Sequence, residues 1–456
     1  MSSVSIEFFR KPCEISFYNK IANGREDNGF LFFEEEIPST TLKSLLLRES
    51  YQTIASNIKP GLNKTIITGT PGIGKSLFLI YLLWKLVKEG QRALLIYDPD
   101  TIYYDGQGGV FELFKGTPAV ADHVFWSKDL WCLFDAKFKS EADLKPLPRQ
   151  ECAFVLSTSP RRDIVNDLRK PPVPQFFFMP PWSETELETI APFFPAVTDW
   201  RGRFKILGGI PRHVLEDTTK TPTSILEAAC KDCSLDLCIE KIGEDSTITE
   251  KSKVVHTLIH ITSDPPFTSQ SVHYASPEAL NIIVRNKGIY ARRRMRELLA
   301  SCQGNPLAAS LCGYVFEQYA IELLEKGGTF TCRQLVHGGT RIKPVETLLD
   351  IAPSKKIVVD KVFPDQTRNQ LYVPKTTNFA AIDAWIPGIG AFQMTVGKKH
   401  DIKGNAIGDL AMLGQGANKL YWLLPPLYYD TFTKQAPRAI DQYAVLILYP
   451  TGERTD

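Results

Sequence analysis

Short apolar runs separated by more polar stretches recur through the first half of the chain. They lie at 65–68, 92–98, 129–135, 152–157 and 175–179. Continuous apolar runs of this length are typical of strands that are buried on both faces of a parallel sheet. An apolar run at 77–84 that leads to Gly90 predicts a helix with a glycine C-cap. We therefore expect an α/β domain at 61–235, in which these strands alternate with helices.

The region before this domain, residues 1–60, is interpreted as a lead-in without recognisable chemistry. Its pattern predicts a strand at 30–33 and a helix at 42–58. Pro60 and Gly61 would end that helix immediately before the first strand of the domain.

The C-terminal third, 306–456, has a different order of elements. The pattern predicts a helix at 306–326 with one apolar stripe, then strands at 329–335, 379–386 and 391–396, a helix at 407–413 and a strand at 420–424. An α-β-β-β-α-β order is the outline of the restriction-endonuclease-like core, so we expect a smaller α/β domain of that kind. The stretch between, 236–305, is expected to be a helical connector, for which a winged-helix-like form is one option.

One motif connects the first strand and the first helix of the α/β domain. Its residues match the P-loop pattern G-x-x-x-x-G-K-[ST] at every defined position: Gly69, Thr70, Pro71, Gly72, Ile73, Gly74, Lys75 and Ser76. Glycines let the backbone curl so that successive N–H groups point at one anion. Lys75 would reach the β- and γ-phosphates of a nucleotide, and Ser76 would offer its hydroxyl to Mg²⁺. A plain glycine-rich turn is the alternative, which the complete match and the flanking elements disfavour. The sequence thus predicts a P-loop NTPase domain that binds ATP or GTP with Mg²⁺.

The strand at 129–135 ends in Asp135, the position of a Walker B acid that holds Mg²⁺ directly or through water. The alternative is an ordinary strand-terminal Asp that caps a turn. Many ATPases of this kind carry a Glu directly after that Asp to orient the attacking water, whereas this chain has Ala136. Nucleotide binding is therefore better supported than fast hydrolysis, and Asp98 or Glu151 remain as other sources of a base.

Two further residues are candidates for contact with the nucleotide phosphates. Ser157 ends the fourth strand, where a polar side chain can sense the γ-phosphate, although an ordinary loop start explains it equally well. Arg212 follows a rigid Gly-Gly-Ile-Pro turn, which would present its side chain as a second sensor. Ser183 and Glu186 have the spacing of a capping box and predict only the start of a helix.

The order of these pieces resembles a known family. The P-loop and the strand ending in Asp135 are followed by Ser157-Thr158-Ser159-Pro160, Met179-Pro180-Pro181-Trp182-Ser183-x-x-Glu186 and Gly208-Gly209-Ile210-Pro211-Arg212. Over roughly 60–235 the chain resembles the P-loop NTPase module of Crinkler effectors and retrotransposon-hot-spot proteins. The resemblance implies an NTPase joined to a nuclease domain, in an effector that acts in the nucleus of a host cell. Families of this kind often begin with a small translocation header, and none is recognisable here.

The C-terminal third resembles the nuclease domain that these proteins attach to their NTPase. The resemblance implies a helical Glu, a strand Asp, a Gln-x-Thr-Val segment and a nearby His, which here are Glu317, Asp383, Gln393-Met394-Thr395-Val396 and His400. The general nuclease pattern is D…(E/Q)-x-K, and Thr395 stands where the Lys would be, so Lys398 or Lys399 would have to supply that charge. Glu317 and Asp383 would hold Mg²⁺ or Mn²⁺, which activates water for attack on a phosphodiester. An active nuclease, a degenerate domain that binds without cutting, and a small α/β domain without a site all remain open.

Two other residue patterns allow a structural and a functional interpretation. Cys230-x-x-Cys233 and His256-x-x-x-His260 suggest zinc, but their separation is longer than in a finger, and core packing of a helix near 221 is the better interpretation. A basic run contains Arg292, Arg293, Arg294 and Arg296. It is either a solvated helix face or a helix that contacts nucleic-acid phosphates.

Composition narrows the classes of protein that fit. The chain has 456 residues, enough for two or three domains, and a net charge of +2, so any nucleic-acid binding must depend on local patches. The start of the chain lacks the apolar segment of a signal peptide, and no apolar run approaches the roughly 18 residues of a membrane span. Nine cysteines, an odd number, suggest reduced thiols inside a cell. We expect an intracellular protein without membrane contact.

Two functions from different classes follow. The first is an enzyme in which the NTPase regulates a metal-dependent nuclease acting on DNA, or on RNA as the less favoured target. The second is a nucleotide switch whose degenerate C-terminal domain binds nucleic acid or a host protein without cutting, and a motor ATPase is a weaker third. Oligomerisation is compatible with each of them.

Overall fold

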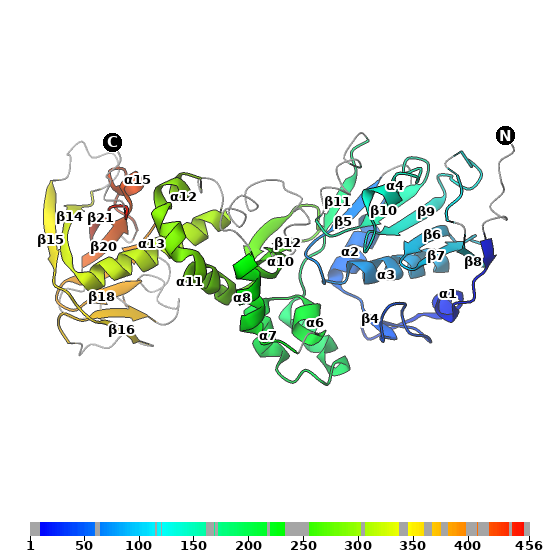
Figure 1. Ribbon diagram of the computed structural model, residues 1–456, viewed down its shortest axis with the longest axis horizontal. Helices are drawn as coiled ribbons and strands as arrows, with labels where there is room; N and C mark the ends of the chain where they lie inside the picture. The colour runs from blue at the N-terminus through cyan, green and yellow to red at the C-terminus, as the bar shows by residue number, and fades with distance from the viewer. Residues whose placement is uncertain are drawn as a thin grey trace. The chain divides into compact units, whose positions relative to one another are not determined.

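The computed structural model describes residues 10–59, 64–114, 116–119, 121–160, 168, 172–216, 219–232, 255–301, 306–336, 345–359, 367–374, 382–397, 408, 419–436 and 440–450. The chain forms two compact units, Met1–Ile282 and Ile283–Asp456, called unit 1 and unit 2 below (Figure 1). The boundary between them falls inside the stretch 236–305 that we expected to be a connector. In the described part of the chain, no helix is both long enough and apolar enough to span a membrane.

Unit 1 is built on an eight-stranded sheet with the order β1-β8-β7-β6-β9-β10-β5-β11. Its strands are β1 (Arg10–Pro12), β5 (Thr65–Thr68), β6 (Arg92–Tyr97), β7 (Asp100–Tyr104), β8 (Val110–Leu113), β9 (Leu130–Asp135), β10 (Ala153–Ser157) and β11 (Gln175–Phe178). The predicted strands are β5, β6, β9, β10 and β11, and they form the parallel part of the sheet, so that prediction is confirmed. The other three strands were not predicted and extend the sheet in antiparallel pairing.

Both faces of this sheet are covered by apolar side chains, which explains the continuous apolar runs in the sequence. Neighbouring residues of β5 point to opposite sides, because Ile67 belongs to one buried cluster and Ile66 to another. Helix α3 (Lys75–Lys88) packs in the first cluster through Phe78, Leu79 and Leu83 and lies along that face of the sheet (Figure 1). Gly90 follows α3 with φ +66°, as the predicted glycine C-cap requires.

The predicted helix at 42–58 is wrong in its first half. Residues Ser44–Leu46 are strand β4, which pairs with β3 (Phe30–Phe32), and β3 pairs with β2 (Arg25–Asp27) in a three-stranded sheet. Helix α2 covers only Glu49–Asn57. Pairing places Leu45 beside Leu31, and both are buried in the first cluster, so tertiary burial overrides the local preference of this leucine-rich segment.

The remaining elements of unit 1 lie outside the eight-stranded sheet. They are α1 (Ser16–Lys20), η2 (Ile21–Asn23), α4 (Glu141–Leu144), α6 (Glu184–Ile190), η3 (Ala191–Phe193), α7 (Trp200–Leu207), η4 (Arg212–Glu216), α8 (Pro222–Asp232), α10 (Val255–Leu258) and the hairpin of β12 (Ile259–Thr262) and β13 (Ser271–Tyr274). The loop of this hairpin reaches the sheet, because Phe267 is buried in the same cluster as α3 and its carbonyl accepts a hydrogen bond of 2.7 Å from the Phe178 amide. Helix α11 (Pro277–Arg293) then crosses the boundary between the units.

Unit 2 contains a second eight-stranded sheet, of order β15-β14-β21-β20-β19-β18-β17-β16. Its strands are β14 (Gly328–Gln334), β15 (Glu346–Ile351), β16 (Lys356–Val359), β17 (Leu371–Pro374), β18 (Ala384–Ile386), β19 (Gly390–Met394), β20 (Lys419–Leu424) and β21 (Asp441–Leu446), and its helices are α12 (Met295–Ser301), α13 (Pro306–Lys326) and α15 (Pro426–Tyr429). Helix α13 and strands β14, β19 and β20 match the prediction, whereas β15, β16, β17 and β21 were not predicted. Strand β18 covers only the last three residues of the strand predicted at 379–386, so Asp383 precedes the strand on which it was expected. The predicted helix at 407–413 falls, with one exception, on residues outside those described.

Cysteine chemistry differs between positions. Among the described residues, five cysteines are buried free thiols, as the sequence suggested: Cys13, Cys132, Cys152, Cys230 and Cys332. Cys312 in α13 is disulfide-bonded, so the expectation of reduced thiols throughout the chain is wrong at this residue.

Candidate functional site

The P-loop at 69–76 connects β5 to the start of α3, at the carboxyl edge of the parallel sheet. Gly69, Gly72 and Gly74 all have positive φ, between +87° and +146°, which side chains rarely adopt. A Cβ at Gly69 would lie 2.5 Å from the Met179 carbonyl oxygen, and a Cβ at Gly74 would lie 2.6 Å from the Tyr51 hydroxyl. Glycine is therefore required here both by conformation and by close packing. Ligands of open α/β sheets bind at this edge, and the N-terminus of a helix favours anions.

Lys75, the first residue of α3, turns its side chain back over the loop. Its Nζ donates to the carbonyl oxygens of Gly69 and Thr70, both at 2.9 Å. Burial lowers the pKa of Lys75 to about 7, against the charge of Asp135, which raises it, and with Arg212, which lowers it further. The loop therefore holds a lysine whose charge is poorly solvated, a state that an anionic ligand would relieve.

Asp135 lies at the end of β9 and is 4% exposed. Burial raises the pKa of this carboxyl, while hydrogen bonds from the Ser76 hydroxyl and the Lys137 amide, and the charge of Lys75, oppose the shift. The Lys137 amide donates to Asp135 Oδ1 at 3.3 Å. The structure thus brings together Lys75, Ser76 and Asp135, which the sequence assigned to phosphate and Mg²⁺. Oxygen atoms from a hydroxyl and a carboxylate are ligands that suit Mg²⁺.

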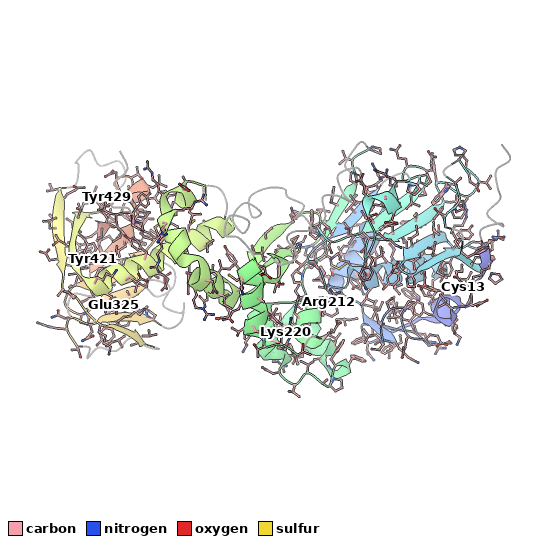
Figure 2. All side chains as sticks on the ribbon, viewed as in Figure 1. Cys13, Arg212, Lys220, Glu325, Tyr421 and Tyr429 are labelled. Atoms are coloured by element: carbon pink, nitrogen blue, oxygen red, sulfur yellow. The ribbon has the colours of Figure 1, made fainter. Side chains whose placement is uncertain are left out.

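The two predicted sensors also lie beside the loop. Ser157 is buried in β10, between β5 and β9, where it pairs with Ile67 and Asp135. Its carbonyl accepts a hydrogen bond of 2.9 Å from the Ala136 amide. The backbone of Ser157 therefore has a structural role that is independent of its side chain. Arg212, labelled in Figure 2, is exposed, and a Cβ at Gly72 would lie 3.8 Å from its Cζ. Both residues are thus close enough to the loop for the predicted roles, which stay predictions.

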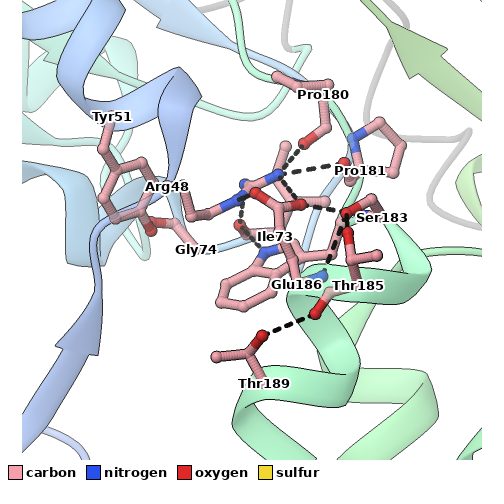
Figure 3. A network of polar contacts seen from close by, with 11 residues as sticks. Arg48, Tyr51, Ile73, Gly74, Pro180, Pro181, Ser183, Thr185, Glu186 and Thr189 are labelled. Atoms are coloured by element: carbon pink, nitrogen blue, oxygen red, sulfur yellow. Dashed lines mark hydrogen bonds and ion pairs between the residues drawn. The ribbon is translucent and has the colours of Figure 1, made fainter. Parts of the chain in front are cut away.

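Side chains from outside the P-loop bind its backbone carbonyls, and the sequence analysis did not predict this (Figure 3). We call this set of residues, Arg48, Tyr51, Trp182 and Glu186, the brace. Arg48, just before α2 and 2% exposed, donates to Glu186 at 2.8 Å and to the Pro180 and Pro181 carbonyls at 3.2 and 3.1 Å. It also donates to the Ile73 carbonyl at 3.4 Å. This region, expected to have no chemistry, therefore supports the loop directly.

Two aromatic side chains complete the brace. The Tyr51 hydroxyl donates to the Gly74 carbonyl at 2.6 Å, and the Trp182 indole donates to the Ile73 carbonyl at 2.8 Å. Glu186 has the predicted capping-box role at the start of α6 and in addition pairs with Arg48. Because the Ile73 and Gly74 carbonyls are bound from outside, the loop is fixed in the curled form that phosphate binding requires. The available signal was the segment Pro180-Pro181-Trp182-Ser183-x-x-Glu186, which the sequence analysis used as a family resemblance and a capping box but did not connect to the loop.

The Cys and His pattern lies in packed surroundings in the same unit. Cys230 in α8 is buried, and its thiol lies 3.9 Å from the Ile282 carbonyl. His260 in β12 packs against Gly208, where a Cβ would lie 2.7 Å from its ring. Burial lowers the pKa of both His256 and His260 to about 3. Cys233 is outside the described residues, and those described contain no group of three or more His, Cys, Asp or Glu placed to hold a metal ion.

The strand β12 also contacts the P-loop itself. The Ile261 amide donates to the Thr70 hydroxyl at 2.9 Å, although these residues are 191 positions apart. Thr70 is thus a side-chain link between the loop and the hairpin that precedes α11.

In unit 2, Glu317 of α13 and Asp383 before β18 form the candidate acidic site. Burial raises the pKa of Glu317 to about 8, and the nearby charge of Asp383 raises it as well. Burial raises the pKa of Asp383 to about 6, against a hydrogen bond of 2.7 Å from the Met394 amide to its Oδ2. Two carboxylates, from a helix and from the start of a strand, are therefore close enough to repel each other, an arrangement that a divalent cation would stabilise.

The other predicted residues of this site have mixed positions. Gln393 in β19 is 3% exposed and directly precedes Met394, whose amide binds Asp383. Thr395 is buried, and its hydroxyl accepts a hydrogen bond of 3.2 Å from the Gly397 amide. Lys398, Lys399 and His400 lie outside the described residues.

The basic run is divided between two helices. Arg292 in α11 pairs with Glu322 at 2.7 Å, and Arg294 pairs with Glu297 at the same distance. Arg293 and Arg296 are exposed. The charges of Arg292 and Arg294 are therefore opposed by carboxylates, which weakens the phosphate-binding interpretation of the run.

Comparison with known proteins identifies the family. No family model matches the chain. It is 46% identical over 430 residues to Crinkler effector protein 15 and, to the same extent, to Crinkler effector protein 16, both from Phytophthora infestans. Each comparison covers 92% of this chain and 69% of the relative, so both units are included. The chain belongs to the Crinkler effector family.

Proposed function

We propose that unit 1 is a P-loop NTPase domain that binds ATP, or GTP, with Mg²⁺, and that it regulates a metal-dependent nuclease site in unit 2. The observation that carries the first half is the buried Lys75, which lies at the N-terminus of α3 beside Ser76 and Asp135. A lysine desolvated in this way gains most from an anion that satisfies its charge. A triphosphate is such an anion, and the loop amides add further donors.

The residues present fit Mg²⁺ at this site. Ser76 and Asp135 are already hydrogen-bonded to each other, and together they offer the hydroxyl and carboxylate oxygens that Mg²⁺ prefers. When bound, the ion would neutralise charge on the phosphate oxygens. Lys75 would bind the β- and γ-phosphates, Ser157 would sense the γ-phosphate, and Arg212 would contact the nucleotide from the side of Gly72.

The second half of the proposal assigns a restriction-endonuclease-like fold and a metal site to unit 2. Glu317 and Asp383 would hold Mg²⁺ or Mn²⁺, because two mutually repelling, partly buried carboxylates favour a divalent cation. Such an ion supplies an activated water for hydrolysis of a phosphodiester. The proposed substrate is DNA, with RNA as the second candidate. In keeping with the names of its relatives, we propose that the chain acts as an effector in a host cell, with the nucleus as its site of action.

One observation favours a different function for unit 2. Thr395 occupies the position of the nuclease lysine, is buried and binds the Gly397 amide, so it adds no positive charge to the site. In this second candidate, unit 2 binds nucleic acid or a host protein without cutting, and unit 1 acts as a nucleotide switch.

Equilibrium binding of a fluorescent ATP analogue, with and without Mg²⁺, tests the nucleotide site. Lys75→Ala should weaken binding by at least about 100-fold, because it removes a charge-assisted contact worth about 1.5 to 3 kcal/mol together with the attraction of its charge. Lys88→Ala is the matched control, since Lys88 is an exposed lysine in the last turn of the same helix. Equal affinity of Lys75→Ala and the parent chain would exclude the P-loop as the nucleotide site. Competition by GTP decides between the two nucleotides.

A further inference from the structure

Asp98 follows β6 at the carboxyl edge of the sheet, next to the strand that ends in Asp135. Strands β6 and β9 are parallel neighbours, and their register pairs Ile96 with Phe134. Asp98 begins the turn from β6 to β7, and Ala136 directly follows β9, so both come just past the carboxyl ends of these neighbouring strands. Ala136 is the position at which many ATPases of this kind carry the Glu that orients water.

The buried clusters show which face of the sheet position 136 belongs to. Leu95 and Tyr97 of β6 belong to the buried cluster that includes α3, whereas Leu94 and Ile96 belong to the cluster on the opposite face. Phe134 of β9 and Ala136, which follows it, also belong to that opposite cluster, so a Glu at 136 would extend from that face. Asp98 lies in the turn between Tyr97 and its partner Asp100, and its ion pair with Lys139 holds its carboxylate beside the segment that follows β9.

The structure also separates the two bases that the sequence left open. Glu151 precedes β10, which begins at Ala153, and is exposed. It therefore lies at the amino edge of the parallel sheet, at the far end of the strands from the P-loop. Asp98 follows β6, which ends at Tyr97, and so lies at the carboxyl edge with Lys75 and Asp135.

A turn after β9 brings a lysine onto Asp98. The Lys139 amide donates to the Ala136 carbonyl at 3.1 Å, and Phe138, inside this turn, has a φ of +63° that is uncommon for a bulky residue. The Phe138 side chain is 80% exposed, so its own packing does not explain this conformation. The turn directs Lys139 back to the edge of the sheet, where its Nζ lies 3.0 Å from Asp98 Oδ1.

We propose that Asp98 is the catalytic carboxylate of nucleotide hydrolysis, in place of the absent Glu at 136, and that Lys139 restrains it in the nucleotide-free protein. The inference rests on the proposed nucleotide site. The oxygen of a water molecule forms a bond to the γ-phosphorus, and the bond from phosphorus to the β,γ-bridging oxygen breaks, its electron pair remaining on the nucleoside diphosphate. The proton released by the water passes to Asp98 and then to solvent. While Asp98 Oδ1 binds Lys139 Nζ at 3.0 Å, this oxygen is directed at the lysine and not at a water molecule, so hydrolysis requires Lys139 to move away.

The test measures nucleotide binding and single-turnover phosphate release on the full chain, in the parent, Asp98→Asn and Glu151→Gln. We expect Asp98→Asn to bind ATP as the parent does and to hydrolyse it about 10² to 10⁴ times more slowly, the usual contribution of a general base. Glu151→Gln should match the parent in both measurements. Asp98→Glu, which keeps the carboxylate, should restore part of the rate.

The outcomes separate this inference from the proposed function. A parent chain that binds no ATP contradicts the nucleotide site itself. A parent chain that binds ATP without releasing phosphate, or an Asp98→Asn variant that hydrolyses at the parent rate, overturns the assignment of Asp98 alone. Lys139→Met should hydrolyse several times faster than the parent, and a rate no higher than that of the parent would overturn the restraint by Lys139.

Discussion

The two candidate sites differ in how their ionisable groups are arranged. In unit 1, a buried lysine lies beside a buried aspartate, so the P-loop site contains charges of both signs before any ligand binds. In unit 2, Glu317 and Asp383 are of one sign, and each is shifted toward its neutral form. Under the proposed function, the first arrangement would suit an anion that comes with a cation, and the second would suit a cation. Opposite pKa shifts, of Lys75 downward and of the two carboxyls upward, thus indicate ligands of opposite charge.

The two sites also differ in how firmly they are supported. Carbonyls of the P-loop are bound from outside by side chains of Arg48, Tyr51 and Trp182, which come from two distant segments. In unit 2, the described contact that positions a carboxylate is the single bond from the Met394 amide to Asp383. The nucleotide site is therefore expected to be preformed, and the acidic site to depend on its metal.

The largest effect is expected at the acidic site, if it cuts. Asp383→Ala should reduce Mg²⁺- or Mn²⁺-dependent cleavage of plasmid DNA by about two orders of magnitude or more, because a metal supplies several kcal/mol of transition-state stabilisation. Binding of ATP should be unchanged, since Asp383 is not in unit 1. Asp350→Ala is the control, because Asp350 is an exposed carboxylate of β15 that binds Thr329. Cleavage that survives Asp383→Ala would remove Asp383 from the cleaving site, and the absence of cleavage by the parent chain would favour the non-cleaving alternative.

The brace offers a smaller effect that sharpens the contrast in preorganisation. Arg48→Lys keeps the charge and loses the planar set of donors that reaches Glu186 and several carbonyls. We expect ATP affinity to fall about tenfold, equivalent to 1.4 kcal/mol, measured by the same fluorescence titration. Arg201→Lys is a matched control, because Arg201 forms an exposed ion pair with Glu188, which lies in α6 together with Glu186. Exposed ion pairs contribute little to stability. Equal losses in the two variants would show that the brace does not act on the loop.

The pH dependence of ATP binding tests the lysine side of the comparison. Phosphates favour the charged form of Lys75, so its pKa must rise on binding from about 7 in the free protein. Between these two pKa values one proton is taken up, and the affinity should fall by up to about tenfold per pH unit as pH rises. Calorimetry at about pH 7.5 to 9, which is above the titration of the phosphate itself, in buffers of different ionisation enthalpy gives the number of protons taken up directly. Proton release on binding would contradict the assigned state of Lys75.

Sequence patterns predicted those features of unit 1 that depend on residues close together in the chain. The P-loop motif, the apolar strand that ends in Asp135 and the capping box at Ser183 each need only a few adjacent residues, and the structure has each of them in the expected element. The brace could not be predicted in this way, because Arg48 and its partner Glu186 are 138 residues apart. The link from Thr70 to Ile261 has the same cause.

The strands that were missed have a different physical reason. Strands β15 and β16 are at the two edges of the second sheet and are largely exposed, so their apolar runs are short: Leu348-Leu349 in β15 and Ile357-Val358-Val359 in β16. Segment 44–46 has the opposite property, since its leucines are compatible with a helix until Leu31 offers a partner strand. In both cases the deciding interaction is pairing with a strand elsewhere in the chain, which the segment itself does not encode.

The smallest expected effect is on the stability of unit 2, and it tests the acidic side of the comparison. The pKa values of Glu317 and Asp383 are raised above the ordinary values of 4.5 and 3.8 to about 8 and about 6. The folded unit therefore binds these protons more tightly than the unfolded chain, and the stability that they contribute is lost as pH rises through about 6 to 8. Glu317→Gln removes one of the two charges. Its melting temperature should exceed that of the parent at pH 8.5, by about 2 to 4 °C for each kcal/mol regained, and should differ little at pH 5.

Calorimetry of the full chain can assign this change in melting temperature to unit 2. ATP should raise the melting temperature of unit 1 alone, so the transition that ATP leaves unchanged belongs to unit 2. Glu325→Gln is the matched control on the same helix, since Glu325 accepts a hydrogen bond from the Lys356 amide that a glutamine can still accept. Mn²⁺ should stabilise the parent at pH 8.5 and have a weaker effect on Glu317→Gln, because the metal then lacks one carboxylate. If Glu317→Gln melts at the temperature of the parent at both pH values, the two carboxyls do not repel each other, and unit 2 has no reason to recruit a cation there. If it is more stable at pH 8.5 while Mn²⁺ affects both chains equally, the repulsion exists but the metal binds elsewhere.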